Sequence, residues 1–167
     1  MRSRSGSSIW LERRPVTAEV ASSSLVRIAI LKKNMTSQIT LILFNLMIVG
    51  VIFTHLFLTT PVVFKSLDEA SAANFLRSIF PRYYLLIITL SLPVLLILFL
   101  DESFGMLKWL AANVSFHAVL GFLLIPLTNA AKDRGWDKVF SFAHGMSVYC
   151  TIVILALSLI QFFLYIG

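Results

Sequence analysis

Four long runs of apolar residues alternate with polar stretches along this chain. The runs cover residues 39–58, 83–100, 106–127 and 140–166. A helix rises about 1.5 Å per residue, so about 20 apolar residues cross the roughly 30 Å hydrocarbon layer of a membrane. The pattern therefore predicts four transmembrane helices, of which the last is long enough to tilt or to protrude.

The stretch between the first two runs, residues 61–84, has a helical pattern of its own. Apolar residues recur along one side of it, while Asp68, Glu69 and Arg77 fall mostly on the other. This spacing is typical of an amphipathic helix lying in the membrane interface. A bend is expected at the proline that ends it. An interfacial anchor is predicted to open the second span, formed by Phe80, Pro81, Arg82, Tyr83 and Tyr84.

The N-terminal residues 1–38 form a basic arm. Seven lysines and arginines in its first 34 residues face only Glu12 and Glu19. Such an arginine- and serine-rich segment resembles an organelle transit peptide, although the two glutamates argue against a simple cleaved presequence. Residues 25–31 are predicted to form a short surface helix. The predicted fold is thus all-α: a four-transmembrane-helix bundle over residues 39–167, with an interfacial amphipathic helix and a basic arm.

Composition supports the membrane assignment. Hydrophobic residues make up 58% of the 167 residues and charged residues 13%, and the mean hydropathy is +0.88. A soluble domain of this length could not bury so much apolar surface. The net charge of +6 comes mostly from the arm, which suits contact with anionic lipid headgroups better than nucleic-acid binding. Four spans place both termini on one side, and the distribution of lysine and arginine leans toward the cytoplasmic or matrix side.

Three histidines lie within the predicted spans: His55, His117 and His144. Two of them on facing helices could ligate a haem iron, bond a quinone or relay a proton. The interpretation we favour is that each donates a hydrogen bond to a neighbouring helix. Spacings typical of metal ligands are absent, so we predict no metal site and no cofactor.

Small and polar residues share one face on each of the last two spans. Such faces usually mark helix–helix contacts. The third span contributes Asn113, His117 and Gly121, and the fourth contributes His144, Gly145, Ser147 and Thr151.

The first residues of the fourth span suggest a hypothesis about how the helices pack there. Gly145 is expected to allow another helix to approach closely, so Gly145→Leu should be more damaging than His144→Ala. His55, at a similar depth, is the expected polar neighbour of His144, with the Phe80–Pro81 bend close by.

Catalysis has little support in the sequence. All eight carboxylates lie outside the predicted spans, which also argues against a proton- or sodium-coupled carrier. A nucleophile elbow and a phosphate-binding loop are both missing. We therefore predict that the protein is not an enzyme.

Three short motifs carry a family resemblance. They read Phe64-Lys65-Ser66-Leu67, Ile79-Phe80-Pro81-x-Tyr83-Tyr84 and His144-Gly145-Met146-Ser147. In these motifs, and over residues 39–167, the chain resembles the transmembrane protein 205-like family of small four-helix membrane proteins. That family often has an asparagine four residues after the serine, where this chain has Thr151. The resemblance implies the architecture and no reaction.

Three functions are compatible with these features. The first is a non-catalytic accessory or scaffold subunit of a larger membrane complex, in the mitochondrial inner membrane. The second is a stand-alone protein of the endomembrane or cell surface that binds or moves a small molecule or lipid. The third is a haem- or quinone-binding membrane subunit. The expected partners are anionic lipid headgroups and other membrane subunits.

Overall fold

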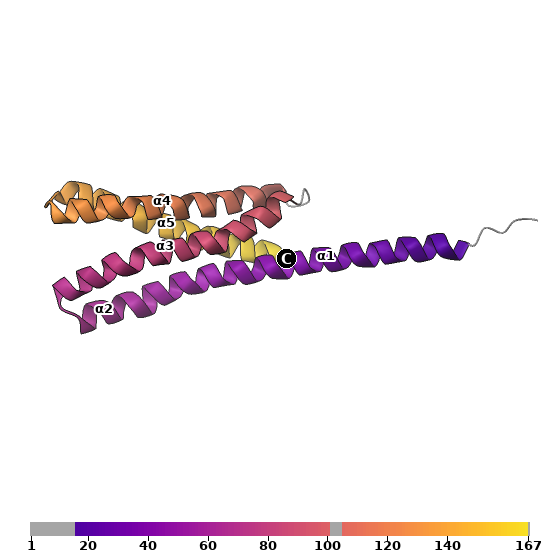
Figure 1. The fold of residues 1–167 in the computed structure, drawn as a ribbon, viewed down its shortest axis with the longest axis horizontal. Coiled ribbons are helices and arrows are strands. Elements are labelled where there is room, and N and C mark those ends of the chain that lie inside the picture. Colours follow the sequence, from indigo (N-terminus) through magenta and orange to yellow (C-terminus); the bar gives the residue numbers. More distant parts are fainter. Residues whose placement is uncertain (1–15, 101–104, 167) are drawn as a thin grey trace, which may run out of the picture. The chain divides into compact units, whose positions relative to one another are not determined.

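The computed structural model describes residues 16–100 and 105–166, and helices account for nearly all of them (Figure 1). In chain order the elements are α1 (Val16–Thr54), the π-helix η1 (His55–Thr59), α2 (Thr60–Ser66), α3 (Glu69–Leu100), α4 (Gly105–Asp133) and α5 (Asp137–Ile166). The chain separates into two units, residues 1–36 and residues 37–167. Residues 25–31, predicted as a short helix, lie within α1, and residues 1–15 of the predicted arm lie outside the described residues.

Four helical stretches among the described residues are long and apolar enough to cross a membrane. They are Met35–Ser66, Glu69–Leu100, Gly105–Asp133 and Asp137–Ile166. These stretches confirm the predicted all-α fold with four transmembrane helices. The chain is an integral, multi-pass membrane protein.

The first span continues past residue 58, where the sequence predicts its end, through η1 and α2 to Ser66. Pro61 sits in the first turn of α2, directly after the wide turn of η1. A proline ring clashes with the carbonyl four residues earlier in a regular α-helix, and a π turn relieves that clash. The hydroxyl of Thr60 donates to the carbonyl oxygen of His55 at 2.9 Å, five residues back, so the chain itself stabilises the wide turn.

The predicted interfacial helix is not a separate element, because it forms one continuous helix, α3, with the second span. Asp68 caps the start of α3 by accepting hydrogen bonds from the backbone N–H of Ser71 at 3.0 Å and from its hydroxyl at 2.7 Å. Pro81 lies inside the helix and removes a single backbone hydrogen bond, a loss that membrane helices tolerate. Buried residues lie on both sides of it, among them Ala72 and Tyr83.

The core of the bundle draws on all four spans of the second unit. One cluster joins Ile52 of α1, Ile87 of α3, Ala118 of α4 and Ile154 of α5. A second, smaller cluster lies around Leu98 and Leu41. Burial of these side chains against one another fixes the helices by close packing, because lipid is as apolar as the core and supplies no hydrophobic driving force between helices.

Close approach between helices occurs at Gly121 on α4. A Cβ atom added to Gly121 would lie 2.2 Å from the Cε1 atom of Tyr84 on α3. The Tyr84 ring is 1% exposed, and its hydroxyl donates to the carbonyl oxygen of Ser147 on α5 at 2.9 Å. Tyr84 therefore ties three helices together, and only glycine leaves room for its ring.

The expectation of a close approach at Gly145 is wrong. A Cβ atom added there would meet nothing within 4 Å, and Gly145 is exposed in the described structure. Gly145 lies two residues before Ser147, on a side of α5 that faces away from the bundle. The close contact instead falls on the glycine opposite a buried aromatic ring.

We expect Gly121→Ala to lower the midpoint of thermal unfolding in detergent. The added methyl group forces the fixed Tyr84 ring to move, and overpacking of this kind costs about 1–3 kcal/mol. Gly145→Ala is the matched control, because it adds the same atom in open space and gains helix propensity of up to about 1 kcal/mol. Equal midpoints for the two variants would contradict the packing described for Tyr84.

The cap of α3 has a signature in the pH dependence of stability. The hydrogen bonds from the backbone N–H and the hydroxyl of Ser71 lower the pKa of Asp68. Its stabilisation is therefore complete above the ordinary aspartate pKa of about 3.9 and is lost as the pH falls through the lower pKa of the folded state. We expect Asp68→Ala to unfold at a lower temperature than the parent at pH 7, and we expect this difference to shrink at an acidic pH well below the ordinary aspartate pKa.

Asp68→Asn is the control for that measurement. Asparagine caps helices about as well as aspartate and carries no titrating charge, so this variant should keep most of the stability and lose the pH dependence of the cap. A parent and an Asp68→Ala variant that differ equally at both pH values would show that the carboxylate is not the capping group.

Candidate functional site

A cavity of about 370 Å³, partly open to the surface, lies in the second unit. Its walls come from five elements, namely η1, α2, α3, α4 and α5. Apolar side chains such as Phe64, Leu76 and Ile152 form most of the wall. Neither a carboxylate nor a lysine or arginine is among the lining residues.

The cavity exists because α3 and α4 diverge beyond the Tyr84–Gly121 contact. In α3 every residue between Ala72 and Tyr83 is at least partly exposed, and the same holds in α4 between Gly121 and Ala131. Figure 1 shows the two helices separating toward the end of α4 at Asp133. Helices that separate without side chains large enough to fill the space leave a void, and this void is the cavity.

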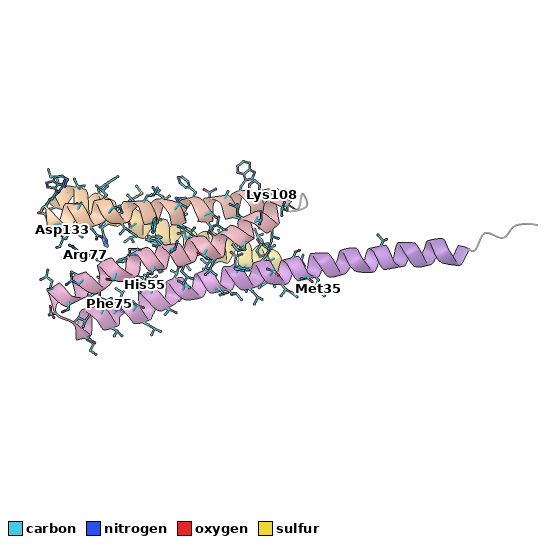
Figure 2. The ribbon with its side chains drawn as sticks, viewed as in Figure 1. Met35, His55, Phe75, Arg77, Lys108 and Asp133 are labelled. Atoms are coloured by element: carbon cyan, nitrogen blue, oxygen red, sulfur yellow. The ribbon has the colours of Figure 1, made fainter. Side chains whose placement is uncertain are left out.

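An ion pair closes the far end of the gap. The Arg77 guanidinium on α3 pairs with both carboxylate oxygens of Asp133 on α4, with Nη1 3.2 Å from Oδ2. Figure 2 shows the two residues on the facing sides of their helices. Both side chains are more than a third exposed, and such pairs contribute only about 0–1 kcal/mol. The pair therefore links the helix ends weakly.

His55 is one of the polar wall residues whose side chain forms no hydrogen bond with the described residues. It is 7% exposed, it is the first residue of η1, and it lines the cavity. Its ring centroid lies 4.6 Å from that of Tyr83 and 5.2 Å from that of Phe80. Within the described part of the chain its ring nitrogens have no hydrogen-bond partner. A polar group at the wall of an apolar cavity can form a hydrogen bond with a ligand there, and few other groups compete for it.

Most other polar groups on the wall are satisfied by the chain itself. The hydroxyl of Thr151 donates to the carbonyl oxygen of Ser147 at 3.1 Å and lies 3.1 Å from the hydroxyl of Tyr84. Thr128 donates to the carbonyl oxygen of Leu124 at 2.8 Å. These groups need no ligand, so they contribute shape rather than hydrogen bonds.

A few wall residues remain available. The Tyr83 hydroxyl is buried and has no hydrogen-bond partner in the described structure. Asn129 of α4 and His144 of α5 both line the cavity. The His144 ring is exposed and stacks on Phe140 at a centroid distance of 5.7 Å. The cavity thus offers an apolar interior with a few neutral hydrogen-bonding groups, among them His55.

The three histidines of the predicted spans do not form one cluster. His55 and His144 lie on the walls of one cavity with Phe80 beside them. His117 is not a lining residue; its Nδ1 lies 2.8 Å from the carbonyl oxygen of Asn113, and its ring centroid is 6.1 Å from that of Tyr149. Groups of three or more histidines, cysteines or carboxylates suited to a metal are absent from the residues described.

The members of the predicted polar faces and of the predicted anchor do not share one environment: some are buried in the bundle and others are exposed. Asn113 is exposed and bonds the carbonyl oxygen of Trp109 at 2.8 Å, so that end of the α4 face makes no contact between helices. Tyr83 and Tyr84 are 5% and 1% exposed, so they face the core and not the membrane interface. Arg82 is the exposed member of the predicted anchor, and it donates to the carbonyl oxygen of Ser78 at 2.6 Å.

Sequence reasoning missed a set of buried polar residues deeper in the bundle. The hydroxyl of Ser115 on α4 donates to that of Ser91 on α3 at 3.1 Å. Polar residues isolated within apolar runs were the available signal. The five buried members are Asn45, Ser91, Ser115, Ser158 and Gln161.

One protein family matches the chain. Residues 43–137 fit a family described as a domain of unknown function, DUF4149. The match includes His55, Phe80 and Asn129 of the cavity wall and ends before the lining residues of α5, which start at His144. Neither the curated proteins nor the solved structures include a significant match. Since the matched residues make up more than half of the 167 residues, the chain belongs to the DUF4149 family.

Proposed function

We propose that this protein binds a small amphiphilic molecule, a lipid or a lipid-like compound, inside the membrane. The observation that carries the proposal is His55, which is 7% exposed and lacks a hydrogen-bond partner among the described residues at the wall of an apolar cavity of about 370 Å³. Pockets for small molecules typically have volumes of about 300–1,000 Å³, apolar walls and a few polar groups that orient the ligand.

The backbone at His55 supports the same proposal. η1 is a single π-helical turn, and such turns occur frequently at functional sites. The turn is held by the chain's own hydrogen bond between Thr60 and the carbonyl oxygen of His55. His55 is therefore placed at the cavity before any ligand binds, and binding does not have to order it.

Binding suits the cavity better than catalysis does. Its wall has no carboxylate or lysine, and the two histidines on it, His55 and His144, have no carboxylate on the wall to orient them as acid or base. The hydroxyl of Thr151 is directed at a backbone carbonyl, so it is not activated by a neighbouring base as nucleophiles are. We accordingly propose a non-enzymatic role.

We also propose in which cellular membrane the protein resides, and two features support different answers. The resemblance to the transmembrane protein 205-like family supports a stand-alone binding protein of the endomembrane or cell surface. The arginine- and serine-rich N-terminal segment supports the mitochondrial inner membrane instead. Fluorescence imaging of the full chain beside markers for both membranes separates the two placements.

The binding site can be tested with two histidine variants. We expect His55→Leu to retain far less co-purifying amphiphile per mole of protein than the parent, by at least about five-fold, because it removes the hydrogen-bonding group inside the cavity. His117→Leu is the matched control, since it makes the same change outside the cavity. The amphiphile is measured by mass spectrometry of lipid extracts after exchange into mild detergent. Equal retention by the parent and both variants would contradict the proposal.

A second candidate function is that of a subunit in a larger membrane complex. It is supported by α1, which is helical from Val16 and includes the basic residues Arg27, Lys32 and Lys33 ahead of the first span at Met35. An ordered helix that carries cations is suited to binding an acidic partner surface.

Native electrophoresis in mild detergent tests this second candidate. A subunit should migrate in a complex much larger than 18.7 kDa, and a chain without residues 1–34 should leave that complex. Migration of the full chain as a free monomer would count against it and would leave the ligand-binding proposal untouched.

A further inference from the structure

Several charged residues lie close in sequence to residues that line the cavity, and more of them are positive than negative. Five charged residues lie within one helical turn of a lining residue on the same helix. Four are cations, which we call the basic rim, and one is an anion. The basic rim consists of Lys65, Arg77, Arg82 and Lys132, and the anion is Asp133.

Three members of the basic rim have no acidic partner among the described residues. Arg77 pairs with Asp133, and Arg82 bonds a backbone carbonyl. Among the described residues, Lys65 and Lys132 form no ion pair. The Nζ atom of Lys132 lies 5.4 Å from the Phe140 ring centroid, and that ring stacks on the wall residue His144. Lys132 is thus linked to the cavity wall through the Phe140 ring, and its charge has no ion-pair partner among the described residues.

The charged residues also indicate how the cavity is oriented relative to the membrane. Lysines and arginines at the ends of apolar helices mark the headgroup level of a membrane. On α5 the lining residues run from His144 to Leu155, a stretch of about 16 Å at 1.5 Å per residue. One leaflet of the hydrocarbon layer is about 15 Å deep, half of roughly 30 Å. The lined stretch of α5 is therefore about as long as an acyl chain in one leaflet.

We propose that the cavity holds one acyl chain of an anionic membrane lipid, with the acidic headgroup at the basic rim. This inference rests on the proposed binding function and names its ligand class. The apolar wall receives the chain, and the neutral groups of His55, Asn129 and His144 are suited to donate hydrogen bonds to ester carbonyl oxygens. Charge is kept outside the cavity, where the headgroup and the cations remain hydrated.

The basic rim distinguishes this ligand from a neutral one. A quinone or a sterol would use the same neutral groups in the cavity and would gain nothing from Lys65 or Lys132. A lipid that merely surrounds the protein would contact the lysines without placing its chain against the partly buried wall residues Leu76 and Leu155. The proposal therefore requires both charge selectivity and labelling inside the cavity.

Photo-cross-linking measures both properties. The full chain is reconstituted in phosphatidylcholine vesicles with a trace of one of three probes that carry the same diazirine on the acyl chain: phosphatidylglycerol, phosphatidylcholine or the free fatty acid. Labelled residues are identified by mass spectrometry. We expect partly buried cavity residues such as Leu76, Ile125 and Leu155 to be labelled more by the anionic probes than by phosphatidylcholine. The stronger of the two anionic probes identifies a phosphate or a carboxylate headgroup.

A lysine variant tests the basic rim. Lys132→Gln should lower the preference for the anionic probe about five-fold, since one lysine near anionic headgroups contributes about that factor. Lys132→Arg keeps the charge and should keep the preference. Lys138→Gln is the matched control, because Lys138 is exposed at the same end of the bundle and lies more than one turn from the first lining residue of α5.

Three results separate failure of this inference from failure of the proposed function. Equal cavity labelling by anionic and neutral probes would overturn the anionic ligand and keep the binding site. An unchanged preference in Lys132→Gln would overturn the basic rim as its cause. If none of the probes labels the cavity, both the inference and the proposed lipid-binding function fail.

Discussion

The contact between Tyr84 and Gly121 determines where the helices of this protein converge. The ring of Tyr84 fills the space that glycine leaves on α4, and its hydroxyl reaches the backbone of α5 at Ser147. Tyr84 belongs to the larger packed cluster of the core. It also lines the cavity, which extends toward the end where α3 and α4 separate. Close packing at one level of the bundle and an open site at the next thus depend on a single aromatic side chain.

Hydrogen bonding divides the polar residues of the bundle into two kinds. Tyr84 and Thr151 are satisfied by backbone carbonyls, as buried groups in a membrane must be to avoid a loss of stability. His55, buried beside them, forms no hydrogen bond with any described residue through its ring, and neither does the Tyr83 hydroxyl. A neighbouring pair of aromatic rings, Phe80 and Tyr83, holds it in place. This contrast within one small region is why we assign structure to the first kind and ligand binding to His55.

The sequence predicts the spans of this protein far better than their faces. Runs of apolar residues identify four membrane helices because length and composition are sufficient for that assignment. The side of each helix that packs cannot be deduced in the same way, since lipid-facing residues are as apolar as buried ones. That ambiguity explains why Gly145 was expected at a close contact that falls on Gly121, and why Tyr83 and Tyr84 were expected at the interface. It also explains why depth alone could bring His55 and His144 to one end of the bundle and leave the cavity between them unforeseen.

The most direct test of a lipid chain in the cavity is magnetisation transfer to the ring of His55. In nuclear magnetic resonance spectra of the full chain in lipid nanodiscs, we expect cross-peaks between the ring protons of His55 and the methylene protons of the lipid chains. A ring that is 7% exposed can approach such protons only if a chain enters the cavity. Cross-peaks to water in place of lipid would show a hydrated void and would contradict the account.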